Sequence, residues 1–251
     1  MKNESFRRDL IFFQEKIKND EPFALTRFGD GEYKIIDDQP IDLLSKQEFK
    51  FDGEKQLRQE LIDSFTYNAP DYYVGIACAC CAGNDLFNAM KQYVKVPEFQ
   101  LTWANIFVNG NYNYFKNNFV ETLKTKKVNL IAPGNHSNLS FITERSFMVG
   151  PNAWVEQANL RNELTALIKD KKLNNQIFIF CAGPFANILC HQLFRLYPQN
   201  TYIDVGSVFN IELGIGANRK YLRGKKNLNK ICLWEIIEKK KTKFNFLGIL
   251  K

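Results

Sequence analysis

Two spacings of hydrophobic residues recur along the chain and predict two kinds of element. Near the N-terminus apolar residues return every three to four positions, which predicts an amphipathic helix over residues 5–19. The same spacing predicts a helix over residues 53–67. Other apolar residues come in short unbroken runs, the clearest at residues 177–181, and such runs are typical of strands buried on both faces.

The expected strands alternate with the expected helices. Strands are predicted at residues 22–28, 72–78, 128–132, 177–181 and 202–205. This alternation indicates an α/β fold, Rossmann-like, with a mostly parallel sheet and helices on both faces. The sequence has no internal repeat and no low-complexity linker. We therefore expect a single α/β domain over residues 1–218, followed by a basic C-terminal extension over residues 219–251 that packs on it.

Composition narrows the class of protein. The chain has 251 residues, of which 45% are hydrophobic and 24% charged, which excludes the collagen-like, disulfide-dense and disordered classes. No run of about 18 apolar residues occurs, so a membrane-spanning helix is not expected. The polar N-terminus does not resemble a secretory signal. We expect a cytoplasmic protein.

The six cysteines are expected to be free. Three of them fall within residues 78–81, while Cys181 and Cys190 lie in an expected strand and an expected helix. This placement favours buried thiols in a reducing compartment over disulfides. The segment CACC lacks a second cysteine pair at zinc-binding spacing, and the chain has only two histidines, so no zinc site is predicted.

The net charge of +7 is concentrated at the C-terminus. From Arg219 to Lys251 there are 11 Lys and Arg against 2 acidic residues, whereas the rest of the chain is close to neutral. Basic residues beside the apolar residues 244–250 suit peripheral contact with an anionic membrane, which would place the protein at the inner membrane face. The alternative, which we favour, is that the apolar residues pack on the domain.

Residues 26–32, with the sequence TRFGDGE, carry the most informative chemistry. Asp30 and Glu32 are two residues apart, so in an extended or tightly turned loop both carboxylates can face the same way. Such a pair suits Mg²⁺ or Mn²⁺, which take their remaining ligands from water and substrate phosphates. Arg27 is expected either to bind a phosphate or to pair with an acid. A surface turn without a ligand explains the same residues.

Loops after other expected strands add candidates, because ligands of open parallel sheets bind at the carboxyl ends of the strands. Gly183 and Pro184 begin an expected helix whose first N–H groups suit an anion such as pyrophosphate. Asp204 ends the last strand, and another loop holds Asn135 and His136. Ordinary turn chemistry accounts for each of these residues as well.

Several nucleotide and hydrolase motifs are missing from the sequence. It contains no P-loop, no three-glycine dinucleotide fingerprint and no G-x-S-x-G nucleophile elbow. The NTPase, dehydrogenase and serine-hydrolase classes are therefore disfavoured.

The block RFGDGE at residues 27–32 resembles the signature of the GT-D glycosyltransferases, a bacterial group with an acidic D-x-E motif. Three later stretches are similar in kind and order, namely PNAW at 151–154, GPFA at 183–186 and IDVG at 203–206. The family commonly follows the last stretch with a histidine, where this chain has Ser207. Together the four stretches span most of the chain.

This resemblance implies a Rossmann-like fold, a UDP-sugar donor and a divalent metal, Mn²⁺ or Mg²⁺, held by Asp30 and Glu32. It predicts a metal-dependent glycosyltransferase that moves a sugar from a nucleotide diphosphate sugar to a glycan, or to a lipid-linked or protein-linked acceptor. The expected catalytic residues are Asp30, Glu32 and Asp204, with Glu156 and His136 as further candidates for a base. The expected donor-binding residues are Arg27, Gly29, Gly31, Asn135, Gly183 and Pro184.

Two other functions are compatible with the same residues. The acids would also serve a metal-dependent hydrolase of a nucleotide or sugar phosphate. The basic tail would serve a non-catalytic nucleic-acid-binding protein, whose affinity falls steeply with salt. The separation of the basic tail from the expected site argues against the second function, and we expect no nucleic-acid partner.

Overall fold

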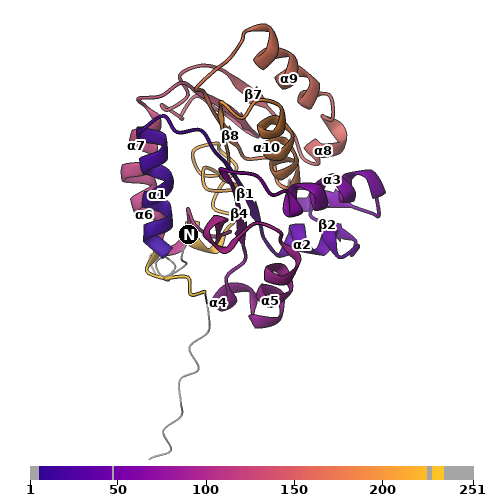
Figure 1. The fold of residues 1–251 in the computed structure, drawn as a ribbon. Coiled ribbons are helices and arrows are strands. Elements are labelled where there is room, and N and C mark those ends of the chain that lie inside the picture. The colour runs from indigo at the N-terminus through magenta and orange to yellow at the C-terminus, as the bar shows by residue number, and fades with distance from the viewer. Residues whose placement is uncertain (1–5, 47, 225–227, 235–251) are drawn as a thin grey trace, which may run out of the picture.

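The computed structural model describes residues 6–46, 48–224 and 228–234 (Figure 1). Among these residues, seven parallel strands form one sheet in the order β5-β4-β1-β9-β8-β6-β7. The strands are β1 (Ala24–Phe28), β4 (Tyr72–Ile76), β5 (Leu101–Trp103), β6 (Val128–Ala132), β7 (Ser146–Met148), β8 (Ile177–Phe180) and β9 (Thr201–Asp204). The expected Rossmann-like α/β class is confirmed.

The sheet has two halves that meet in its middle. Strands β1, β4 and β5 come from the first half of the chain and β6 to β9 from the second, and the halves join where β1 pairs with β9. The first half runs outward from this junction, from β1 through β4 to β5, and the second half returns to it, from β6 through β8 to β9. In open parallel sheets such a switch point creates a crevice outside the carboxyl ends of the strands, where ligands bind.

Helices cover both faces of the sheet (Figure 1). They are α1 (Phe6–Lys18), α2 (Asp30–Ile36), α3 (Lys55–Thr66), α4 (Ala79–Ala82), α5 (Asn84–Tyr93), α6 (Tyr112–Tyr114), α7 (Val120–Leu123), α8 (Ala153–Glu156), α9 (Leu160–Asp170) and α10 (Pro184–Leu196). Helices α1, α6 and α7 lie on one side, and α3 and α10 lie on the other. A short antiparallel hairpin, β2 (Ile41–Asp42) and β3 (Lys50–Phe51), lies beyond α2.

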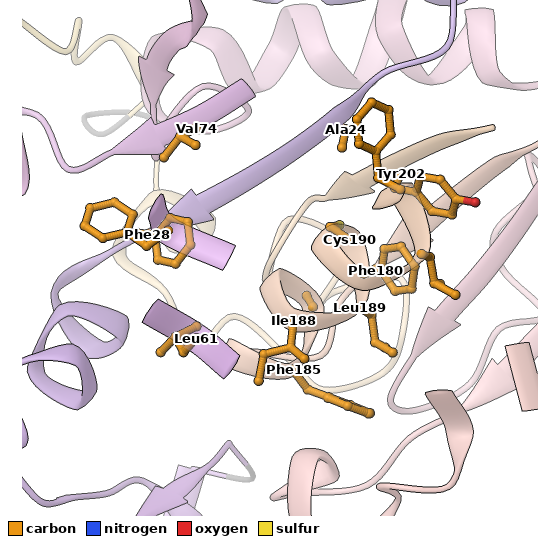
Figure 2. Close-up of a cluster of buried hydrophobic side chains, with 14 of the residues drawn as sticks. Ala24, Phe28, Leu61, Val74, Phe180, Phe185, Ile188, Leu189, Cys190 and Tyr202 are labelled. Carbon is orange, nitrogen blue, oxygen red and sulfur yellow. The ribbon is translucent and has the colours of Figure 1, made fainter. Parts of the chain in front are cut away.

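Strand β8 shows how one apolar run serves both faces. Ile177 and Ile179 belong to the hydrophobic cluster under α1, whereas Phe178 and Phe180 belong to the cluster under α10. Figure 2 shows part of the second cluster, with the side chains of α10 packed against the sheet. Successive residues of a strand point to opposite faces, so a strand covered on both sides needs an unbroken apolar sequence.

The strands that the hydrophobic pattern did not predict are short or lie at the edge of the sheet. Strand β5 has three residues, and β7 is an edge strand whose Met148 side chain is exposed, so neither shows an apolar run of strand length. Within the part of the chain that the structure describes, no helix combines the length and the apolar character needed to cross a bilayer.

Part of the C-terminal extension is described and packs on the domain. The Trp234 ring lies 4.9 Å from that of Phe87 and 4.8 Å from that of Trp103, measured between centroids. The backbone N–H of Gly110 donates to the Lys230 carbonyl at 2.7 Å. The lysines at 239–241 and the apolar residues 244–250 lie outside the described residues, so both the membrane contact and the favoured packing of these apolar residues stay predictions.

Candidate functional site

A cavity of about 320 Å³ lies at the carboxyl ends of the strands, around the junction of β1 with β9. Its walls come from the segments that follow β1, β5, β6, β8 and β9, together with the hairpin and α8. Among the lining residues are Arg27, Gly29, Asp30, Glu32, Lys46, Glu48, Phe49, Asn105, Asn152, Trp154, Gly183, Asp204, Gly206, Ser207, Arg219 and Tyr221. Of the loops expected at this rim of the sheet, those after β1, β8 and β9 meet in one cavity, whereas residues 83–85 and 134–138 do not line it.

The acidic pair lies on a helix rather than in a loop. We expected an extended or tightly turned loop after the first strand, but α2 begins at Asp30 directly after Gly29. Asp30 is the first residue of this helix and Glu32 the third, and both line the cavity. The expectation of a loop was wrong because a carboxylate at the third helical position can accept from the N–H that precedes the helix, which stabilises the helix start.

Glu32 makes that contact. Its Oε2 accepts a hydrogen bond from the Gly29 backbone N–H at 2.9 Å. The pKa of Glu32 is raised to about 7, mainly because the side chain is buried. Backbone hydrogen bonds lower this pKa, and the negative charges of Asp204 and Asp30 raise it. Asp30 is exposed at the cavity mouth. The acidic pair therefore consists of one solvated carboxylate and one that exchanges its proton near neutral pH.

Arg27 and Asp204 form a buried ion pair on the cavity floor. Arg27 Nη2 lies 3.4 Å from Asp204 Oδ1, Nε donates to the Asp204 carbonyl at 2.7 Å, and Nη1 donates to the Ala104 carbonyl at 2.6 Å. Burial raises the pKa of Asp204, while the Arg27 guanidinium lowers it. Of the two roles expected for Arg27, the structure shows the pairing with an acid, and phosphate binding stays a prediction.

The turn after β9 fits around this guanidinium. Gly206 has φ +58°, and its backbone N–H donates to Asp204 Oδ1 at 2.8 Å. A Cβ atom at Gly206 would lie 2.3 Å from Arg27 Nη2. The backbone conformation therefore favours glycine here, and any larger residue would displace the Arg27 guanidinium.

Helix α10 presents its first turn to the cavity through Gly183. This glycine has φ +55° and lines the cavity, and Pro184 is the first helical residue. Farther along α10, the Asn187 side-chain oxygen accepts from the Arg27 backbone N–H at 2.9 Å. The helix is thus fastened to β1 beside the residue that carries the ion pair.

The hairpin and α8 contribute residues that sequence patterns did not assign to the site. Asn152 has φ +54° and precedes α8, and its Oδ1 accepts from the Lys50 backbone N–H at 3.0 Å and from Trp154 Nε1 at 2.8 Å. The PNAW stretch identified by resemblance therefore fastens the hairpin to α8 at the cavity wall. The resemblance located this stretch without giving it a role.

A second ion pair crosses the cavity. Arg219 Nη2 donates to Glu48 Oε1 at 2.6 Å, and both residues line the cavity. The two residues are 171 positions apart, so no local pattern could have paired them. Ser207, which stands where the family commonly has a histidine, forms a hydrogen bond with the Tyr221 hydroxyl at 3.0 Å.

Several residues expected at the site lie, in the described chain, outside the cavity lining. Gly31 and Pro184 are neighbours of lining residues, and a Cβ at Gly31 would lie 3.1 Å from the Phe49 ring. Asn135 Oδ1 accepts from the Ser137 backbone N–H at 2.9 Å. His136 Nε2 contacts the Ala132 carbonyl at 2.9 Å, and Glu156 ends α8. The roles expected for these residues stay predictions.

The chemistry of the cavity acids fits a divalent cation of the hard, oxygen-binding kind. Asp30 and Glu32 offer carboxylate oxygens at one helix end, and they do not form a closed cage of protein ligands. Mg²⁺ and Mn²⁺ are held in this way when waters and substrate phosphates supply the other ligands. The residues therefore suit a metal that binds together with a phosphorylated substrate.

The chain resembles known proteins in its three-dimensional structure. No family model matches the chain, and no curated protein matches it. A solved structure described as a new glycosyltransferase (DUF1792) from Streptococcus sanguinis is 14% identical, aligns over 95% of this chain and 96% of its own, and has a TM-score of 0.57.

Two further solved structures are similar over 90% of this chain and 89% of theirs. One is described as the highly conserved domain of unknown function 1792 with a distinct glycosyltransferase fold, at 19% identity and a TM-score of 0.54. The other is a selenomethionine-substituted structure of the same domain, at 18% identity and a TM-score of 0.56. The chain has the DUF1792 fold. This confirms the fold that the RFGDGE resemblance implied, and the DUF1792 fold extends over nearly the whole chain.

Proposed function

We propose that this protein is a glycosyltransferase that moves a sugar from a nucleotide diphosphate sugar, UDP-linked, to a glycan, lipid-linked or protein-linked acceptor. The observation that carries the proposal is the position of Asp30 and Glu32 in a cavity at the β1–β9 switch point. The likeness to DUF1792 structures described as glycosyltransferases supports it.

Asp30 and Glu32 would hold Mn²⁺ or Mg²⁺ against the two phosphates of the donor. The metal supplies charge neutralisation for the diphosphate as it leaves. Because the Glu32 pKa is about 7, the side chain is largely ionised above that pH, and a bound cation favours the ionised form further. Gly29 and Gly183 line the same cavity and allow close approach of backbone to a ligand.

Arg27 and Asp204 would shape the floor under the donor. Three guanidinium nitrogens of Arg27 already contact protein oxygens, and Asp204 Oδ1 is shared between Arg27 and the Gly206 N–H. These contacts favour a positioning role for Asp204, with the guanidinium held as a fixed positive charge beneath the diphosphate. The alternative is that Asp204 acts as a catalytic base, and Asp204→Asn tests this alternative.

The proposal is tested by measuring UDP release from a panel of UDP-sugars with Mn²⁺, with and without candidate acceptors. A thermal-shift screen of nucleotides first selects the donor, because a ligand that binds the folded state raises the melting temperature. Asp30→Asn and Glu32→Gln are expected to lower the rate about 10²-fold or more, as loss of a charge-stabilising contact does.

Asp37→Asn is the matched control for Asp30→Asn, because Asp37 is an exposed residue at the other end of α2. It should keep the wild-type rate. UDP release that does not depend on any acceptor would favour the metal-dependent hydrolase instead. Wild-type rates in Asp30→Asn and Glu32→Gln would refute the assignment of the site.

A further inference from the structure

Four of the six cysteines gather in one place, and none of the four lines the cavity that holds the acidic pair. Cys78 follows β4 and precedes α4, Cys80 and Cys81 lie in α4, and Cys232 comes from the C-terminal extension. Their four Sγ atoms all lie within 4.8 Å of one another. Within the described chain this is the one cluster of three or more cysteine, histidine or acidic side chains close enough to hold a metal.

The spacing of the sulfurs matches a single tetrahedral ion. The Sγ atoms of Cys78 and Cys80 are 3.6 Å apart, those of Cys80 and Cys81 are 3.9 Å apart, and those of Cys81 and Cys232 are 4.0 Å apart. A zinc ion with Zn–S bonds of about 2.3 Å holds its four sulfurs about 3.8 Å apart. A disulfide brings two sulfurs to about 2.05 Å, and all four cysteines are free.

Each sulfur also accepts an N–H hydrogen bond from the surrounding protein. Asn105 Nδ2 donates to Cys78 at 3.5 Å, and the Leu233 backbone N–H donates to Cys80 at 3.2 Å. Asn109 Nδ2 lies 3.3 Å from the Cys232 sulfur and 3.9 Å from the Cys81 sulfur. Donors around the ligand atoms are typical of metal centres, where they offset the negative charge of the thiolates and orient the ligands.

The cluster joins two parts of the chain that are distant in sequence. Cys81 and Cys232 are 151 residues apart, and the extension that carries Cys232 also contacts the domain through Lys230 and Trp234. The ammonium group of Lys230 lies beside Cys81, where a positive charge would partly balance four thiolates. Asn105 links the cluster to the active-site cavity, because it lines that cavity and donates to Cys78.

We propose that Cys78, Cys80, Cys81 and Cys232 bind one Zn²⁺ ion that fastens the C-terminal extension to the start of α4. Zinc is the inferred metal because four thiolates in a tetrahedron select a soft ion of this geometry. All four positions belong to the protein, so the site is structural rather than catalytic. The prediction from sequence that no zinc site is present is therefore reversed, because the fourth ligand is far from the CACC segment.

The test uses the full-length chain, purified with and without added zinc, and measures metal content by mass spectrometry. We expect one zinc per chain. Cys81→Ala removes a ligand whose side chain is exposed, so folding should survive, and its zinc affinity should fall at least tenfold. Cys232→Ala removes the ligand from the extension and should have the same effect. Cys190→Ala is the matched control, because Cys190 is a buried cysteine outside the cluster.

Two further measurements have their main readout on the wild-type protein, so they remain informative even if a variant fails to fold. Cobalt substituted into the wild-type protein should give the intense visible absorption of a tetrahedral tetrathiolate complex, and Cys81→Ala should weaken it. A chelator should lower the melting temperature of the wild type and of Cys190→Ala by more than that of Cys81→Ala. Wild-type zinc affinity in Cys81→Ala, iron in place of zinc, a disulfide within the cluster, or no metal after reconstitution would overturn the proposal.

Discussion

Replacing Gly206 with alanine tests the geometry that holds the cavity floor together. The added methyl group would lie 2.3 Å from Arg27 Nη2, and residue 206 would have to keep φ near +58°. The guanidinium is the end of a flexible side chain and can move away. The cost is therefore the sum of backbone strain and of the hydrogen bonds that Arg27 gives up.

Each part of this cost has a known size. A non-glycine residue in the left-handed region costs about 1–2 kcal/mol. Moving Nη2 away from Asp204 weakens a charge-assisted contact within a buried pair, and such contacts contribute about 1.5–3 kcal/mol. We expect Gly206→Ala to lower the free energy of unfolding by about 3 kcal/mol or more.

Gly214→Ala is the matched control. Gly214 has φ +74°, and a Cβ atom there would meet nothing within 4 Å, so this variant carries the backbone strain alone. Urea unfolding of both variants, followed by tryptophan fluorescence, separates the two contributions. Equal losses of stability in the two variants would show that the Arg27 contacts add nothing, and would refute the argument.

Two more predictions concern Asp9, which is buried, and Asn152, which is half-buried. Burial raises the pKa of Asp9 to about 6, so between pH 4 and pH 6 the folded protein holds a proton that the unfolded chain has released, and stability falls as the pH rises. Asp9→Asn should therefore gain about 2–3 kcal/mol relative to the wild type between pH 4 and pH 7, and a constant difference would contradict this. Asn152→Ala should lose about 1–3 kcal/mol in urea unfolding because the Lys50 backbone N–H loses its acceptor, whereas Trp154 Nε1 keeps the Lys50 carbonyl at 3.2 Å. Asn152→Asp, which keeps an acceptor, should lose less.

The sequence predicted those parts of the fold whose signal is local. The run at 177–181 became β8, and the glycine–proline start at 183–184 became the first turn of α10. The acidic pair was placed correctly at the end of β1, but its helical conformation depends on Glu32 accepting from Gly29, which spacing alone did not show. Short and edge elements such as β7 lacked the apolar run that marks a buried strand.

Contacts between distant segments were beyond any local pattern. Arg27 pairs with Asp204 across 177 residues, and Cys232 completes a cluster that begins at Cys78. From the sequence, Arg27 and Asp204 were identified separately, and Cys232 was not considered as a metal ligand. The order of strands in the sheet brings Arg27 and Asp204 together, and the course of the C-terminal extension brings Cys232 to the cluster. The residue types identified candidate site residues, but the tertiary fold determines which of these residues contact one another.

The proposed function depends on Asp30 and Glu32 holding a divalent cation against the donor's diphosphate. Diffraction from crystals grown with Mn²⁺ and UDP, recorded at the manganese absorption edge, would locate this cation. We expect an anomalous peak that contacts both carboxylates and the two phosphates. A cavity in which UDP binds with no manganese beside Asp30 and Glu32, or manganese bound elsewhere, would contradict it.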